Sequence, residues 1–227
     1  SSDLLLFLLL ICLLFIPSVI PAFAVEDQVT VYNASDLKEA LEDPAGSNIK
    51  LGANIKFPAS LRADDAVEIP DGKHFLDLNG FTIEYSFINS SREYSGTPIR
   101  VQNGQLTING NGAVKGGRLA IEVAGWNSVL TINGGSFSGA AHSAIRVQGV
   151  AIINGGDLEG RFGDVWLDGG LLVDNAGVVK RIDKTTAKIV GADIRNGKLT
   201  GETELHIPLT LKDLEMPVGS SLTIQKD

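Results

Sequence analysis

The chain has 227 residues with a formal net charge of −8, 26 glycines, one cysteine and a low aromatic fraction of 6%. This acidic balance excludes ordinary nucleic-acid binding, which needs basic patches. The single Cys12 excludes a disulfide framework, and because it lies in the apolar N-terminal segment it leaves the rest of the chain without a thiol for catalysis.

The N-terminal segment is apolar. Residues 4–16 are almost purely Leu, Ile and Phe, and Pro17, Pro21 and the run Ala22-Phe23-Ala24 follow. This order is typical of a secretory signal peptide and predicts an exported protein, so residues 1–24 form a separate segment. Two alternatives stay open. Residues 4–23 are about long enough for a membrane anchor, or they form an assembly helix like those in the cores of type IV pilin-like filaments.

Residues 25–60 are predicted to form a cap at the N-terminal end of the rest of the fold. Residues 28–32 alternate as a strand, and Ser35 is the predicted N-cap of a short helix over 36–43, which Pro44 and Gly46 end. Short strands are expected at 49–51 and 55–57. A strand and a small amphipathic helix here would cover the open end of a solenoid and block edge-to-edge pairing.

Residues 61–227 repeat with a period of 20 to 24 residues, which is the signature of a solenoid. A short apolar run precedes an asparagine in each repeat, and the spacings are 24, 21, 21 and 21 residues: Asn109, Asn133, Asn154, Asn175 and Asn196. Asparagine before glycine is a turn signal. In stacked coils the same turn recurs one strand spacing higher, so we expect these amides to form a hydrogen-bonded column.

Two further columns of short strands accompany the asparagine column. One contains residues 99–101, 121–123, 145–147 and 165–167, and the other contains residues 113–116, 136–139, 157–160 and 198–201. Three short strands in a coil of about 22 residues predict an all-β, parallel β-helix of about eight coils. Each coil buries its apolar side only against its neighbours.

Three segments resemble the opening of the right-handed β-helix proteins of the pectin-lyase-like superfamily: Ser35–Leu41, Ile49–Ile55 and Leu76–Ile83. The segment Leu130–Gly139 is similar to repeats in bacterial cell-surface and adhesin-like members. The resemblance covers residues 28–224 and implies the fold. It leaves the activity open, because one fold hosts many functions.

The catalytic motifs of that superfamily are missing. Its lyases combine carboxylates that hold Ca²⁺ with an Arg or Lys base, and its hydrolases use paired aspartates with a Gly-His-Gly motif. Here Asp64-Asp65 lies near the first coils, and Arg181-Ile182-Asp183 departs from the hydrolases' Arg-Ile-Lys. The histidines are singly placed: His74, His142 and His206. We therefore predict no catalytic residues and no cofactor, with a polysaccharide lyase or glycoside hydrolase as the alternative.

Four aspartates fall within one coil and are the candidates for a Ca²⁺ site: Asp157, Asp164, Asp168 and Asp174. Carboxylate oxygens suit Ca²⁺, but the tight Asp-x-Asp spacing of a dedicated loop is missing. A solvated acidic face is the other interpretation. Arg100, Glu122 and Arg146 recur at equivalent outward positions, which predicts exposed ion pairs that stabilise the coil stack.

Four aromatic residues are candidates for a contact surface: Phe87, Tyr94, Trp126 and Trp166. The first two fall in an insertion at 86–97, and insertions in solenoids emerge as loops on one face. Exposed tryptophan stacks on sugar rings, which predicts a carbohydrate-binding module, although it equally covers the apolar edge of a coil.

The sequence as a whole predicts a secreted or cell-surface protein with a structural or adhesive role and no catalytic activity. One form of this hypothesis is a filament subunit. Other subunits of the protein are expected partners, by self-association or by end-to-end stacking. The last strand, near 222–224, shows no capping helix, so we expect another subunit to cover that end, unless the natural chain continues. Surface glycans are the other expected partner. Membrane contact is expected only through residues 4–23.

Overall fold

The computed structural model describes residues 28–58, 65–88 and 94–183, together with four short strands at 192–195, 198–200, 203–205 and 222–224. Side chains are described as far as Asp183. Residues 1–24 lie outside this part of the chain, so the signal, anchor and assembly hypotheses stay predictions. None of the helices in the described residues is long and apolar enough to cross a membrane.

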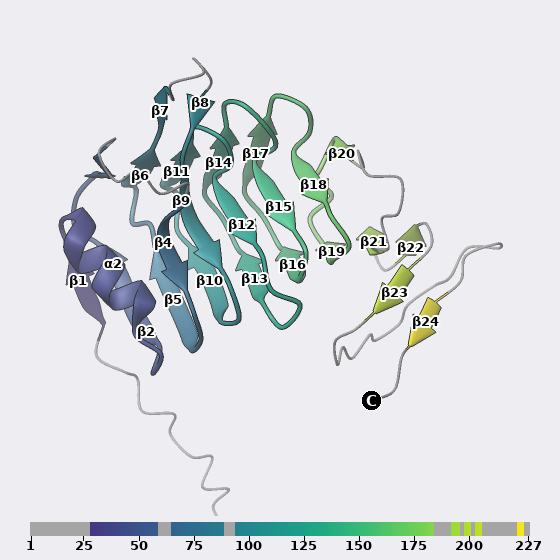
Figure 1. Cartoon of the computed structure of the whole chain (residues 1–227), viewed down its shortest axis with the longest axis horizontal. Coiled ribbons are helices and arrows are strands. Elements are labelled where there is room, and N and C mark those ends of the chain that lie inside the picture. The colour runs from purple at the N-terminus through teal and green to yellow at the C-terminus, as the bar shows by residue number, and fades with distance from the viewer. Residues whose placement is uncertain are drawn as a thin grey trace, which may run out of the picture.

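Most of the strands form three large sheets (Figure 1). Sheet A contains β1 (Val29–Val31), β2 (Ser47–Leu51), β5 (Lys73–Asp77), β10 (Gln105–Asn109), β13 (Val129–Ile132), β16 (Val150–Ile153), β19 (Leu171–Asp174), β21 (Ala192–Arg195) and β22 (Lys198–Thr200). Sheet B contains β3 (Ile55–Lys56), β6 (Thr82–Tyr85), β11 (Ala113–Gly116), β14 (Ser136–Gly139) and β17 (Asp157–Gly160). Sheet C contains β4 (Asp65–Ile69), β9 (Thr97–Val101), β12 (Ile121–Val123), β15 (Ile145–Val147), β18 (Val165–Leu167) and β20 (Ile182–Asp183).

The chain runs from sheet C to sheet A to sheet B and then returns to sheet C one strand higher. Within the described residues, four coils carry all three strands, from β4–β5–β6 to β15–β16–β17, and partial coils precede and follow them. Neighbouring strands of these coils pair in parallel, for example Ile108 with Ile132 and Ile121 with Ile145. The predicted parallel β-helix is confirmed.

One strand was predicted in the wrong sheet. Residues 198–201 were expected to extend the column of residues 113–116, which is sheet B, but β22 pairs antiparallel with β21 at the end of sheet A. The two residues between these strands are Asn-Gly, the dipeptide that most favours a two-residue hairpin. Two more short strands, β23 (Thr203–Leu205) and β24 (Leu222–Ile224), pair with each other.

The core is a column of aliphatic side chains that point into the tube. The inward positions of sheet A hold Leu106, Leu130, Ala151 and Leu172 in one row and Ile108, Ile132 and Ile153 in the next, all at most 1% exposed. Alternate residues of a strand point to opposite faces, so the residues between these inward positions lie on the outer face of the sheet. Each fully buried Leu or Ile contributes roughly 1.5–3 kcal/mol.

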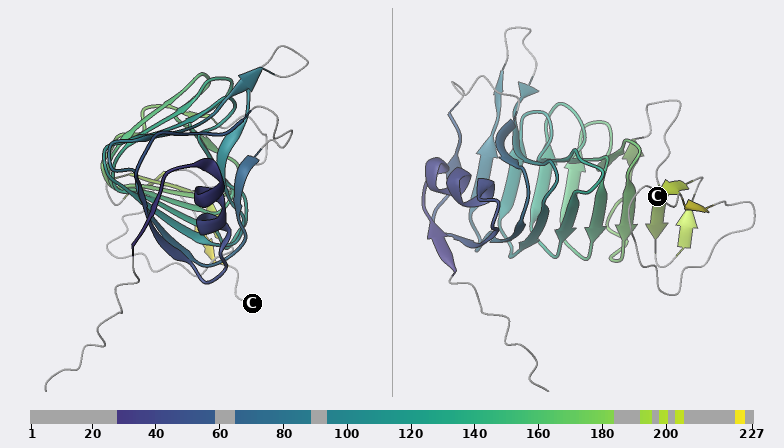
Figure 2. Two further views of the ribbon diagram at one scale, coloured as in Figure 1. Left: turned by 90° about the vertical axis from the view of Figure 1, so that its left-hand side faces the viewer. Right: turned by 60° about the horizontal axis from the view of Figure 1, so that its bottom comes forward.

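The helix α2 (Ala34–Glu42) lies across the N-terminal end of the tube, as Figure 2 shows in its left view. Leu37 and Leu41 are fully buried against the first coils. The predicted cap residue was wrong: Asn33 is the N-cap, and its side chain accepts hydrogen bonds from the backbone N–H groups of Ser35 and Asp36, both at 3.0 Å. The helix starts two residues earlier than expected, which places Ser35 in its first turn.

The cap continues directly into the solenoid, because β2 pairs with β5 in sheet A and β3 pairs with β6 in sheet B. The insertion expected at 86–97 forms an antiparallel hairpin of β7 (Phe87–Ile88) and β8 (Tyr94–Ser95), and the residues between them lie outside the described part. This hairpin projects from the coil at the junction of sheets B and C (Figure 1).

Hydrogen bonds join four of the repeated asparagines, at the turn between sheets A and B. The Nδ2 of Asn133 donates to Oδ1 of Asn109 at 2.8 Å, Asn154 donates to Asn133 at 2.8 Å, and Asn175 donates to Asn154 at 2.7 Å. Asn196 lies outside the described residues. One coil earlier, Asp77 is the register partner of Asn109.

Candidate functional site

The outward side chains of sheet C form a row that crosses five strands. Register places Arg100, Glu122, Arg146 and Trp166 on adjacent strands, and Asp183 follows Trp166 on β20. The sequence predicted the first four of these as one column, and the structure brings them together. Because the strands are hydrogen-bonded neighbours, successive members of this row are about 4.8 Å apart along the tube axis.

The charged members of this row are less exposed than expected. The Glu122 side chain is only 6% exposed, and Nη1 of Arg146 donates to its Oε1. Arg100 lies on the other side, with its Nε 4.0 Å from Oε2 of Glu122. The prediction of exposed ion pairs was therefore wrong for Glu122: the two flanking arginines cover this carboxylate, and their charges compensate the cost of burying it.

Asp168 extends this network, and the sequence did not pair it with Arg146. Its Oδ2 accepts from Nε of Arg146 at 3.0 Å and from Nε2 of Gln148 at 3.0 Å. Arg146 thus binds two carboxylates from two neighbouring coils. Charge-assisted pairs of this kind are stronger than neutral ones, so the guanidinium is fixed above the indole of Trp166, 4.4 Å from the ring centroid.

An aromatic cluster lies beside this network. The imidazole of His142 stacks on the Trp166 indole, with centroids 4.4 Å apart and 26° between the planes. Phe162 meets His142 edge-on at 5.5 Å, and the Arg161 guanidinium lies 5.3 Å from the Phe162 ring centroid. Phe162 is 56% exposed. We call His142, Arg161, Phe162 and Trp166 the aromatic cluster.

The electrostatic setting of His142 favours its neutral form. Burial lowers the pKa of the imidazole below its usual value, and the neighbouring Arg118 and Arg146 lower it further, while Asp183 opposes them. The buried polar atoms that have no hydrogen-bond partner within the described residues include Nδ1 of His142, Nε1 of Trp166 and Oδ2 of Asp183. Buried polar atoms are normally paired, so these atoms are exceptions in this part of the structure.

The four aspartates proposed for Ca²⁺ have separate roles. Asp164 is buried and accepts from the backbone N–H groups of Lys180 and Arg181, at 2.8 and 3.0 Å. Asp174 is buried and accepts from the N–H groups of Val178 and Val179. Asp157 is exposed at the start of β17, and Asp168 binds Arg146. The described part of the chain holds no group of three His, Cys, Asp or Glu residues arranged for a metal ion.

The other predicted contact residues are spread over the surface. Phe87 packs on Tyr85 with ring centroids 5.4 Å apart, which makes it part of the edge of the core. The side chain of Tyr94 lies outside the described residues. Trp126 is 52% exposed in the turn that leads from β12 to β13, at the opposite end of the sheet C strands from His142 and Phe162.

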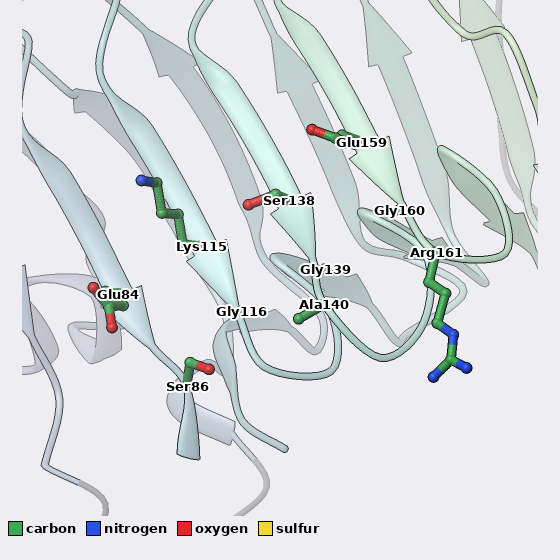
Figure 3. A pocket seen from close by; sticks show the side chains of 10 residues that line it. All are labelled: Glu84, Ser86, Lys115, Gly116, Ser138, Gly139, Ala140, Glu159, Gly160 and Arg161. Carbon is green, nitrogen blue, oxygen red and sulfur yellow. The ribbon is translucent and has the colours of Figure 1, made fainter. Parts of the chain in front are cut away.

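A shallow groove of about 480 Å³ follows the outer face of sheet B (Figure 3). Its lining includes Glu84, Lys115, Ser138 and Glu159, which are register partners on four adjacent strands. The two glutamates are three strand spacings apart, roughly 14 Å along the axis, and the carboxylates of an inverting glycosidase are only about 6.5–9.5 Å apart. Lys56 also binds Glu84, at 2.8 Å. This pair of glutamates does not match the glycosidase arrangement.

Comparison with known protein families gives a match over residues 28–158 to the family described as "Putative pectate lyase-like adhesive domain". The chain belongs to this family. The match covers the cap and the coils up to β17, and it agrees with the three parallel sheets. The family description suggests an adhesive role and a location at the cell surface. Searches of curated proteins and of solved structures each found no match.

Sequence reasoning missed His142, Arg161 and Phe162 as partners of Trp166. Two signals were available. Residues 140–143 and 161–163 occupy the same turn, between sheets B and C, in consecutive coils. This turn also precedes the strand that carries the next outward residue of sheet C, so its side chains are neighbours of the Trp166 column.

Proposed function

We propose that this protein is an adhesive domain of a cell surface that binds glycans through the aromatic cluster and does not cleave them. The observation that carries the proposal is Phe162, a large aromatic ring that is 56% exposed yet lies between His142 and Arg161 at a fixed place on the coil stack. An exposed ring on a rigid scaffold is a suitable platform for the apolar face of a sugar.

The cluster also offers polar groups next to that platform. The Arg161 guanidinium lies beside Phe162, and a guanidinium recognises carboxylates with two parallel hydrogen bonds. A glycan that contains an acidic sugar therefore matches the cluster better than a neutral one. The adhesive description of the family supports the same class of function.

Binding to an array of immobilised glycans tests this proposal. The full chain is compared with Phe162→Ala and with Trp126→Ala, which removes an exposed ring of similar accessibility from the far end of sheet C. We expect the first change to lower binding at least tenfold and the second to leave it unchanged. Equal losses in both variants, or binding that survives Phe162→Ala, would remove the cluster as the site.

The hydrolase alternative has its best residues on β17, where Asp157 and Glu159 are both exposed and two positions apart on one face of the strand. Two strand positions span roughly 6.6 Å, a separation close to that of catalytic carboxylates. Their neighbours on β14 are Ser136 and Ser138, which supply no third carboxylate and no arginine. Cleavage of any glycan that is lost in Glu159→Gln would support this alternative against an adhesive role.

The filament hypothesis depends on residues 1–24 and is tested separately. Intact mass and N-terminal sequencing of the native protein show whether the apolar segment is kept. A mature chain that starts near Val25 favours a secreted or surface-attached domain, whereas a retained segment favours an anchor or an assembly helix.

A further inference from the structure

The outer face of sheet A carries no charged side chain over four consecutive strands, from β10 to β19. Its accessible outward residues, with the turn asparagines beside them, are Gln105, Thr107, Asn109, Val129, Thr131, Asn133, Ile152, Asn154, Val173 and Asn175. We call this surface the neutral face. In a chain in which 20% of the residues are charged, ten neutral neighbours make a distinct surface.

The other two sheets differ from the neutral face. Sheet B presents Glu84, Lys115 and Glu159 outward, and sheet C presents Arg100, Glu122 and Arg146. The whole chain carries a net charge of −8. Two copies therefore repel each other at a distance, and the neutral face is where they can approach with the least desolvation of charge.

The neutral face is also complementary to itself. Along one edge, the amides of Asn133 and Asn154 each use one N–H and one oxygen lone pair for the neighbouring coils, so each has a second N–H and a second lone pair for an outside partner. A row of groups that both donate and accept can pair with an identical row. The central row of Thr131, Ile152 and Val173 consists of β-branched residues, which suits face-to-face packing of two sheets.

We propose that the neutral face docks a second copy of this chain, sheet A against sheet A, across a twofold axis. A twofold interface brings the same patch together from both subunits, so it requires the self-complementarity described above. The next strand of sheet A, β5, continues the central row with the aromatic ring of Phe75, the register partner of Thr107. On the same face of β5, Phe75 lies between the charged residues Lys73 and Asp77. A neutral glycan, the other conceivable occupant, would have few aromatic rings to stack on.

The size of the neutral face sets the strength of this contact. Four strands at about 4.8 Å and three outward positions at about 6.6 Å give roughly 300–400 Å² per copy. Stable interfaces bury about 800 Å² per partner. The contact is therefore weak between single molecules and becomes effective when many copies face each other, as multivalency multiplies weak affinities. It acts between surfaces that both carry this protein, independently of the glycan site.

Bead aggregation tests this inference. Beads coated with the full chain should aggregate with each other, whereas the same chain in solution should sediment as a monomer at micromolar concentration. The double variant Thr131→Lys/Ile152→Lys should reduce aggregation at least tenfold. The matched control Ser138→Lys adds the same kind of charge to the outer face of sheet B and should aggregate like the wild type.

A second pair of variants keeps the test decisive if the lysine variant aggregates poorly for another reason. Beads with Thr131→Lys/Ile152→Lys, mixed with beads that carry Thr131→Glu/Ile152→Glu, should aggregate again, because opposite charges now meet across the axis. Wild-type beads that stay dispersed, equal loss in Ser138→Lys, or failure of the mixed pair to aggregate would each overturn the proposal. Loss of glycan binding in the double lysine variant without any bead aggregation would assign the neutral face to a glycan instead.

Discussion

His142 and Trp166 stack across one coil of the solenoid, with ring centroids 4.4 Å apart. The first residue lies in the turn before β15 and the second on β18, so they are neighbours only because the coils are in register. Phe162 meets the same imidazole from the next turn. The position of the exposed Phe162 ring therefore depends on the stacking of the coils.

Stability should depend on pH through His142. Its pKa is lowered in the folded state by burial and by Arg118 and Arg146, against the effect of Asp183. In the unfolded chain, His142 takes up a proton below about pH 6.5, the usual pKa of histidine. The folded chain resists this protonation, so folding stability is full above that pH. The stability falls as the pH drops from about 6.5 toward the lowered pKa of the folded state. Urea unfolding of wild type and His142→Gln at pH 7.5 and 5.5 measures this. The variant should lose less stability on acidification, and an equal loss in both would contradict the assignment.

Glu122→Gln should destabilise the fold by about 1.5–3 kcal/mol, because it removes the charge that two arginines share at a buried position. The control is Lys56→Gln, which breaks the exposed pair with Glu84 and should cost less than about 1 kcal/mol. Denaturant titration of both variants gives the comparison. If Glu122→Gln costs no more than the control, the pair with Arg146 does not hold the sheet C row together.

Gly116→Ala should be among the most damaging single changes. A Cβ at this position would lie 1.6 Å from the carbonyl oxygen of Leu119 in the turn between sheets B and C. The backbone must move, so we expect a loss of about 3 kcal/mol, the upper end for overpacking. Gly177→Ala is the control, because its Cβ would meet nothing within 4 Å although its φ is +66°. Denaturant unfolding of the two variants measures this. Similar unfolding midpoints for Gly116→Ala and Gly177→Ala would show that the turn is not tightly packed.

Asn154→Ala should lower stability by about 1 kcal/mol, because it deletes the amide that donates to Asn133 and accepts from Asn175. At this chain length the thermal midpoint should fall by about 2–4 °C. Asn103→Ala, an exposed residue in the turn before β10, serves as the comparison and should leave the midpoint unchanged. An equal thermal midpoint in both variants would show that the asparagine column does not contribute to stability.

The parts of the fold that were predictable are those that repeat. A period of 21 residues brings Asn133, Asn154 and Asn175 to the same turn of successive coils, so their hydrogen bonds follow from the spacing alone. The strand positions of sheet C follow in the same way. The cap helix was found from its apolar stripe, but its first residue was misplaced because both Asn33 and Ser35 are good N-caps and only the geometry chooses between them.

The candidate site was harder to predict because its contacts join turns to strands. Asp168 follows β18 by one residue and reaches Arg146 one coil away, a contact that depends on turn geometry and on side-chain length. Phe162 and His142 carry no repeated motif. Lys198–Gly201 looked like another strand of sheet B, but the Asn-Gly dipeptide before it favours a hairpin, so a local turn preference overrode the repeat.

The most direct test of the adhesive account exposes a panel of acidic and neutral oligosaccharides to the full chain and measures both the bound fraction and the mass of each sugar afterwards. The account predicts binding of at least one acidic oligosaccharide that Phe162→Ala abolishes, with every sugar recovered at its original mass. Shortened products or unsaturated ends in the wild-type reaction, absent with Glu159→Gln, would contradict it and identify a catalytic β-helix instead.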